Sequence, residues 1–403
     1  MSVSPPQSVK LYYRLDNHHQ TAKPYPTMAS CFEDLPGEII CLIVLYACAP
    51  CLADAAFLSA TGSYFRSIAR PIVLERLRDH RNTLTGMAFD IGRLAVVDKA
   101  LRVSAVLTNL NLQGNDIGPS GATVIGEALC GNAVLKTLDL FDNRIRAKGA
   151  AAIAEALRGN VVLTALNVGF SYLTEESALG IVRVERQRNK LTSLGLAACK
   201  IGPVGAAEIA EYVSGSGVLK SLSIRNNKIG PAGATEIAEA LRGNMVLSSL
   251  DVGPNSLTEE SALCIVRAER QRNKLTFLGL AACKIGPVGA VEIAEYVSRS
   301  GVLKSLTLWN NNIGDAGAKA LASALRVNGV MESLNIRYNG IGPGGAATIA
   351  DALRDNAVLT QIVLLGNRLG DDGEKLLWDA VSGRVGFELL ICEPHELELE
   401  SMF

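Results

Sequence analysis

The sequence is organised by a repeat of 28 residues. Ten consecutive copies open on an apolar residue with no slip in register, namely Leu107, Leu135, Leu163, Leu191, Leu219, Leu247, Leu275, Leu303, Met331 and Leu359. In the copy that begins at Leu135, Leu138, Leu140 and Asn143 follow three, five and eight residues later. A fixed period of this length predicts a solenoid, in which each unit packs against its neighbours in the stack.

Each repeat has two halves with different apolar spacing. Leu138 and Leu140 alternate with polar residues, which predicts a short strand with the intervening side chains facing out. Ala150, Ile153 and Leu157 recur at helical spacing, which predicts a helix returning antiparallel to the strand. Strands pack about 4.8 Å apart and helices about 8 to 10 Å apart, so the stack must bend with its strands inside.

An asparagine recurs eight residues into most copies. It occupies positions 115, 143, 227, 255, 311, 339 and 367. Its amide both donates and accepts, so we expect it to satisfy backbone groups where the chain turns away from the strand. Ser171, Cys199 and Cys283 replace it in three units, which predicts a locally weaker turn network. Gly-Asn pairs such as Gly159-Asn160 are predicted to stop the helices.

A block of three repeats is duplicated, because residues 168–222 and 252–306 are nearly the same sequence. Both copies contain a helix that opens with Thr-Glu-Glu and ends with basic residues: Arg183, Arg186, Arg188 and Lys190, and again Arg267, Arg270, Arg272 and Lys274. Acidic residues first and basic residues last suit the helix dipole. Partner binding by these convex basic ridges is the alternative interpretation.

The repeat resembles the ribonuclease-inhibitor type of leucine-rich repeat, which is also found in NOD-like receptors and the Ran GTPase-activating protein. This resemblance implies an α/β horseshoe of about ten β-α units over residues 107–386, with parallel strands on the concave face and helices on the convex face. Residues 85–106 are predicted to form a capping half-repeat, and 387–403 a cap strand and an acidic tail. Phe387, Leu390 and Cys392 are expected to continue the register.

The segment before the repeats has a different character. Residues 1–30 lack periodicity and are predicted to be a flexible leader. Residues 31–84 contain the entry Leu35-Pro36-Gly-Glu-Ile39, a run of branched aliphatic residues, and Tyr64-Phe-Arg-Ser-Ile-Ala-Arg-Pro71. This pattern resembles an F-box, which in its family docks on the Skp adaptor of a cullin-RING ubiquitin ligase. The resemblance places Leu35, Pro36, Ile39, Ile43 and Leu52 at the adaptor interface.

This segment has other interpretations. These helices are also suited to capping the N-terminal end of the solenoid without binding an adaptor. A membrane segment over residues 39–53 is disfavoured, because the run is shorter than about 20 residues and contains Pro50. Cys48 and Cys51 have the spacing of a zinc or redox pair, but a tetrahedral site needs two more ligands. We therefore expect no metal site.

Composition restricts the classes of partner and the compartment. The chain has 39 Lys and Arg against 40 Asp and Glu, so no overall field favours nucleic acid or an anionic membrane. Nine cysteines, an odd number, indicate a reduced intracellular protein, and no secretory signal pattern opens the chain. We expect a cytoplasmic or nuclear location, or both.

No catalytic constellation is found in the sequence. A phosphate-binding loop, a His-Glu-x-x-His helix and a Gly-x-Ser-x-Gly elbow are all missing from it, so we expect no enzyme activity, no catalytic residue and no cofactor. Binding is favoured instead, at the outward strand positions two, four, six and seven residues into each copy. The candidate partner-binding residues are Phe141, Asp142, Arg225, Asp251, Trp309, Arg337 and Tyr338.

Exposed aromatic and arginine side chains commonly anchor protein interfaces. Trp309, Arg337 and Tyr338 are predicted to lie together on neighbouring strands. The alternative is a solvated face with isolated aromatic residues. We interpret the chain as an F-box substrate receptor, monomeric outside its complex, that holds an unidentified protein on its concave face. A scaffold or immune-type sensor and a Ran-type GTPase-activating protein are the alternatives.

Overall fold

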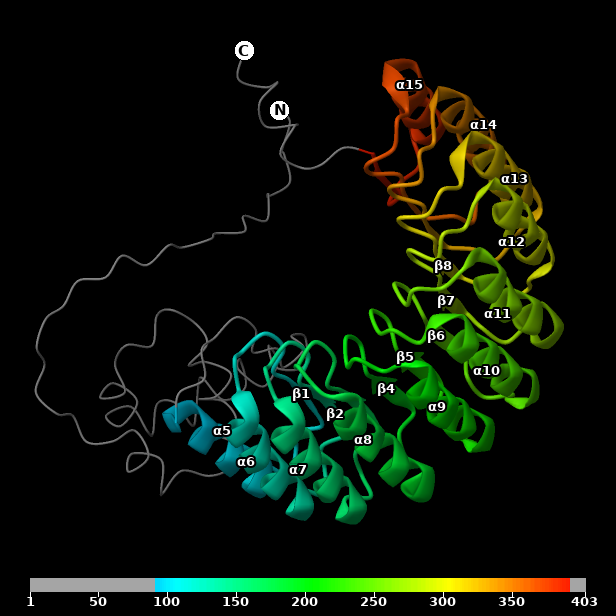
Figure 1. The fold of residues 1–403 in the computed structure, drawn as a ribbon. Coiled ribbons are helices and arrows are strands. Elements are labelled where there is room, and N and C mark those ends of the chain that lie inside the picture. The colour runs from blue at the N-terminus through cyan, green and yellow to red at the C-terminus, as the bar shows by residue number, and fades with distance from the viewer. Residues whose placement is uncertain (1–90, 392–403) are drawn as a thin grey trace, which may run out of the picture.

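The computed structural model describes residues 91–391, which form one curved stack of alternating strands and helices (Figure 1). The strands are β1 (Asn109–Asn111), β2 (Thr137–Asp139), β3 (Ala165–Asn167), β4 (Ser193–Gly195), β5 (Ser221–Ser223), β6 (Ser249–Asp251), β7 (Phe277–Gly279), β8 (Ser305–Thr307), β9 (Ser333–Asn335), β10 (Gln361–Val363) and β11 (Glu388–Leu390). The helices are α5 (Ile91–Val103), α6 (Gly118–Gly131), α7 (Arg146–Gly159), α8 (Glu175–Arg188), α9 (Pro203–Gly215), α10 (Gly230–Gly243), α11 (Glu259–Arg272), α12 (Pro287–Arg299), α13 (Gly314–Val327), α14 (Pro343–Asp355) and α15 (Gly370–Val381).

The strands form a single parallel sheet whose order follows the sequence from β1 to β11. Leu110 pairs with Leu138, and Leu138 with Leu166, so neighbouring strands from β1 to β10 are offset by one full repeat. The strands line the inside of the curve and the helices cover its outside (Figure 1). The predicted α/β solenoid is therefore confirmed.

The core runs continuously between the two layers. Leu135, Leu138 and Leu140 are buried from the strand side, and Ile153 and Leu157 are buried from the helix side. The same positions are buried in the other repeats, so one apolar column extends along the whole described stack. No helix among residues 91–391 combines the length and the apolar character that a membrane span requires.

The last strand departs from the predicted register by one residue. Ile362 pairs with Leu389, so Leu389 and Ile391 point into the core while Leu390 is 41% exposed. The prediction that Leu390 points inward was therefore wrong. Gly383 and Gly386, with φ of +84° and +77°, turn the chain tightly between α15 and β11, and the last repeat is one residue shorter. Cys392 lies outside the described residues, as does the whole segment 31–84.

The recurring asparagine links each turn to the next. Asn227 donates from Nδ2 to the carbonyl oxygens of Leu196 and Ile224, and its Oδ1 accepts from the amides of Cys199 and Ile201. Asn227 N in turn donates to Asn255 Oδ1. Each amide thus satisfies backbone groups in two units, as the sequence predicts.

A second asparagine series ends the helices. Asn160 Nδ2 donates to the carbonyl of Leu129 at 2.9 Å, and its Oδ1 accepts from the amides of Val162 and Leu163. The backbone of Asn160 is extended, and the preceding Gly159 does not adopt a left-handed conformation. The predicted Gly-Asn stop therefore works through the asparagine amide, which joins consecutive helix ends.

Replacing Cys199 with asparagine is expected to stabilise the protein by about 1 kcal/mol, the net value of a hydrogen bond. The Cys199 thiol is buried and donates to Ala197 O within its own turn at 3.5 Å. Asparagine at this position would also form hydrogen bonds with backbone groups of the preceding repeat, as Asn227 does. Urea unfolding followed by circular dichroism measures the change. An unchanged or lower midpoint would show that the cysteine does not weaken the turn.

Candidate functional site

A cluster of three large side chains lies on the concave face near the C-terminal end of the stack. Trp309 follows β8, and Arg337 and Tyr338 follow β9. The guanidinium carbon of Arg337 lies 5.8 Å from the centroid of the Trp309 ring and 4.8 Å from that of Tyr338. Both distances are in the range of cation–π attraction. We call these three residues the aromatic clamp.

A glycine on the next repeat positions one side of the clamp. A Cβ atom added to Gly366 would lie 2.0 Å from Cε1 of Tyr338, and Gly366 has a φ of +66°. The missing side chain leaves room for the Tyr338 ring against the backbone of the neighbouring turn. Tyr338 remains 43% exposed, so its outer side is open for contact.

The cation in the clamp is held by rings rather than by hydrogen bonds. Nε of Arg337 is buried and has no hydrogen-bond partner among residues 91–391. None of the carboxylates in this described range forms an ion pair with it either. The side chain as a whole is half-buried. The structure thus presents an unneutralised, partly desolvated guanidinium on the concave face.

Arg225 and Asp251 form a second group, near the middle of the sheet. Oδ1 of Asp251 accepts a hydrogen bond from Gly253 N at 3.0 Å. Burial raises the pKa of the Asp251 carboxyl, while the Gly253 amide and the positive charge of Arg225 act in the opposite direction. A Cβ atom at Gly279 would lie 2.4 Å from Oδ1 of Asp251, so the glycine makes room for this carboxylate. Arg225 lies near this carboxylate without forming an ion pair with it, and its buried Nε, like that of Arg337, has no hydrogen-bond partner among residues 91–391.

Phe141 and Asp142 belong to a third group, toward the N-terminal end. The Phe141 ring lies 5.0 Å from the Phe170 ring, tilted by 44°, and Asp142 is exposed beside it. Phe170 was not among the seven predicted site residues. Its position seven residues into the repeat, where Tyr338 also lies, is the sequence signal that identifies it.

The small residues between these groups are less exposed than predicted. Gly169, Ala197, Gly253 and Ala281 occupy the position six residues into their repeats, which we expected to face outward, but all four are buried. A Cβ atom at Gly169 would lie 3.0 Å from the Cβ of Ala197, because adjacent turns pack closely here. The seven predicted residues consequently form three separate groups, and the aromatic clamp is the most compact.

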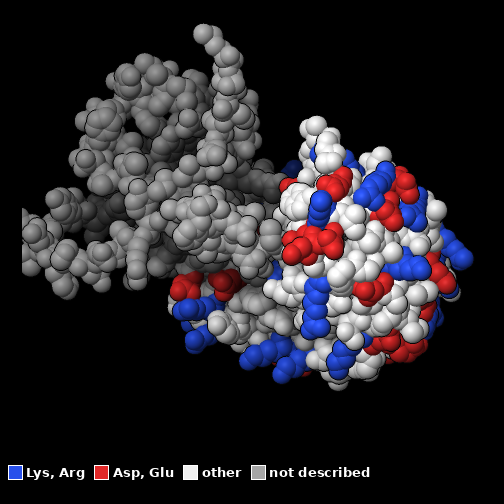
Figure 2. Space-filling view, turned by 90° about the horizontal axis from the view of Figure 1, so that it is seen from above, with Lys and Arg blue, Asp and Glu red and all other residues white. Residues whose placement is uncertain are grey.

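The arginines of the basic ridges on the convex face form ion pairs within the described part of the chain. Nη1 of Arg183 lies 2.5 Å from Glu176, and its Nε lies 2.9 Å from Glu208 on the next helix. Arg186 pairs with Glu211 at 2.8 Å. The duplicated Arg267 and Arg270 repeat these ion pairs. Figure 2 shows acidic and basic side chains intermingled over the visible surface. These contacts neutralise the exposed arginines of the ridges, whereas the exposed Lys190 and Lys274 form no ion pair among residues 91–391.

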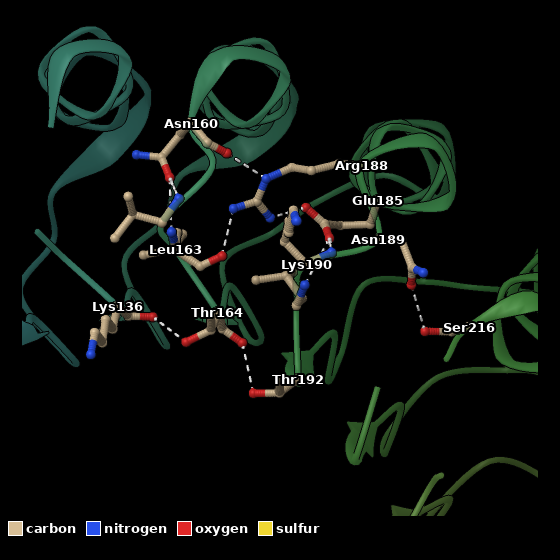
Figure 3. A network of polar contacts seen from close by, with 12 residues as sticks. Lys136, Asn160, Leu163, Thr164, Glu185, Arg188, Asn189, Lys190, Thr192 and Ser216 are labelled. Carbon is tan, nitrogen blue, oxygen red and sulfur yellow. Dashed lines mark hydrogen bonds and ion pairs between the residues drawn. The ribbon is translucent and has the colours of Figure 1, made fainter. Parts of the chain in front are cut away.

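Two of these arginines are structural. The Arg188 side chain is buried, forms an ion pair with the buried Glu185, and donates to the carbonyl oxygens of Asn160 and Leu163 (Figure 3). Glu185 accepts in return from the backbone amide of Leu191 at 3.0 Å. The pair takes the place of the helix-ending asparagine found in other repeats. Arg272 and Glu269 form the same arrangement in the duplicated block.

Two cysteine thiols are buried among the described residues. Burial raises the pKa of both the Cys199 and the Cys283 thiol to about 12, so neither is a reactive thiolate at neutral pH. Among residues 91–391, no three His, Cys, Asp or Glu side chains are grouped to hold a metal ion.

Comparison with known proteins identifies the repeats. A leucine-rich repeat family model matches residues 103–126, 131–154, 218–238, 302–322 and 328–350. The repeats in these ranges are therefore leucine-rich repeats, as their pattern predicts. No curated protein matches the chain in sequence.

Two solved structures show partial likeness. Leiomodin-1 actin-binding site 2 is 23% identical over 46% of this chain and 91% of that structure, with a TM-score of 0.30. The tropomodulin C-terminal domain of Caenorhabditis elegans is 12% identical over 38% of this chain and 92% of that structure, with a TM-score of 0.32. Both superpose only weakly.

Proposed function

We propose that this chain is a protein-binding subunit without catalytic activity, and that its partner contacts the concave face at the aromatic clamp. The observation that carries this proposal is the uncompensated Arg337 between Trp309 and Tyr338. Tryptophan, tyrosine and arginine are the residue types most enriched at energetically dominant interface positions. On the convex face, by contrast, Arg183 and Arg186 are paired with glutamates.

We further propose that the chain is an F-box type substrate receptor of a cullin-RING ubiquitin ligase, located in the cytoplasm, the nucleus or both. Support comes from the F-box-like sequence of residues 31–84 directly before the repeats. In this proposal Leu35, Pro36, Ile39, Ile43 and Leu52 dock on a Skp-type adaptor. The repeats hold a protein substrate near the ubiquitin-charged enzyme, so the mechanism is proximity.

A binding experiment with the full-length chain and purified Skp-type adaptor tests the ligase role. The wild type should co-purify with the adaptor, whereas a Leu35→Asp/Ile39→Asp variant with native circular dichroism should not. A Trp309→Ala variant is the matched control, because it alters the concave face and leaves the proposed adaptor interface intact. Failure of the well-folded wild type to bind would overturn the ligase role and leave an interaction scaffold.

A further inference from the structure

We propose that the aromatic clamp binds a carboxylate side chain in an acidic segment of the protein partner. This inference rests on the proposed protein-binding function and specifies the chemistry of its partner. On the convex face Arg158, Arg242 and Arg354 each pair with an acidic residue three positions away on the same helix. Arg337, on the concave face, has no such partner among residues 91–391.

The geometry of the clamp favours a planar anion. The Arg337 guanidinium lies against the Trp309 and Tyr338 rings, which restrict the directions open to a ligand. The edge of a guanidinium presents parallel N–H donors whose spacing matches the two oxygens of a carboxylate. Because Nε is already buried, an approaching carboxylate would bind the terminal nitrogens. An ion pair beside two rings is less screened by water than one in open solvent.

The balance of charges in the chain and around the clamp favours an anionic protein side chain over nucleic acid. The chain carries 39 basic and 40 acidic residues, and Arg225, the other arginine among the predicted site residues, has the Asp251 carboxylate nearby. Binding to a phosphate backbone relies on many unneutralised cations. A single clamped arginine beside an exposed tyrosine instead suits one acidic side chain flanked by apolar or aromatic groups.

The test uses Trp309 fluorescence in the full-length chain. The sequence has two tryptophans, and Trp378 is 50% exposed on α15, so a Trp378→Phe background leaves Trp309 as the reporter. The probe is a blocked peptide of alternating glutamate and serine, with its glutamine counterpart as control. The glutamate peptide should bind at least about tenfold more tightly, as one charged hydrogen-bonded contact provides. Its affinity should fall as salt rises from about 0.1 M to 1 M.

Variants separate the clamp from general charge. Arg337→Gln should abolish the preference for glutamate. Arg337→Lys should also weaken binding several-fold, because an ammonium keeps the charge but lacks the stacked planar fork. Arg158→Gln removes an exposed convex arginine paired with Glu155 and should have no effect. Native circular dichroism of each variant is required for the comparison.

Equal affinity for the glutamate and glutamine peptides would overturn the inference. So would unchanged binding by Arg337→Gln, or tighter binding of a single-stranded oligonucleotide than of the glutamate peptide. These results are independent of the adaptor experiment. Adaptor binding without peptide selectivity would remove the inference alone, and peptide selectivity without adaptor binding would remove the ligase role alone.

Discussion

Glu269→Ala is expected to lower the free energy of unfolding of the adjoining repeats by about 3 to 5 kcal/mol, the usual cost of breaking a buried ion pair from one side. Glu269 and the Arg272 side chain are 0% and 1% exposed. The carboxylate accepts from Arg272 Nε at 2.8 Å and from Leu275 N at 2.6 Å. Its removal leaves a buried cation and a buried backbone amide without their partner.

Urea unfolding followed by circular dichroism measures this loss, and hydrogen exchange at Leu275 locates it. Glu239→Ala on the preceding helix is the matched control, because this carboxylate forms an exposed ion pair with Arg242. The control should leave the midpoint unchanged. Glu185→Ala, in the duplicated block, should reproduce the effect of Glu269→Ala. A midpoint for Glu269→Ala equal to that of the control would contradict a structural role for the buried pair.

The architecture follows from the repeat because each local signal is reused. The 28-residue spacing of leucines predicted the parallel ladder, and the strands from β1 to β10 pair in that register. The asparagine at positions such as 227 predicted the turn network, since a buried amide with both donors and acceptors is useful where backbone groups need partners. Periodicity therefore specifies nearly all of the described fold.

Features that break the repeat were less predictable. Glu175 looked like a residue that suits its own helix dipole, yet Oε1 accepts from Gly202 N and Gly205 N at the start of α9. The first hydrogen bond joins residues 27 positions apart, and the second joins residues 30 positions apart. Arg188 was predicted to belong to a convex basic ridge, because spacing alone does not reveal that its side chain is buried against Glu185. The shortened last repeat depended on the backbone angles of Gly383 and Gly386.

The candidate site was predictable in part. Outward strand positions identified Trp309, Arg337 and Tyr338, and the structure brings all three together. The sequence did not separate Arg337, which lies against two rings, from Arg225, which has the Asp251 carboxylate nearby, because it does not show which side chains lie beside each arginine. It also did not show that Gly366 leaves the space for Tyr338. These distinctions arise from contacts between repeats.

Asn227→Ala is expected to destabilise the repeats on either side of β5 by about 3 kcal/mol, because several buried backbone groups lose their partners at once. Leu196 O and Ile224 O lose donors at 2.9 Å and 2.8 Å, and Cys199 N and Ile201 N lose acceptors at 2.8 Å and 3.0 Å. Cys199 offers no compensating amide in the preceding turn, so we expect a larger loss than at turns flanked by asparagine on both sides.

Hydrogen exchange provides the sharpest measurement of this effect. The amides of Cys199 and Ile201 should exchange faster in the Asn227→Ala variant, while those of distant repeats should keep their rates, because each unit of a solenoid contacts its neighbours alone. Asn312→Ala is the control, since Asn312 is an exposed asparagine whose backbone amide forms the bond to Ile285 O. If both variants unfold at the same urea concentration as the wild type, the asparagine ladder does not hold adjacent turns together, and packing of the leucine column is sufficient for the fold.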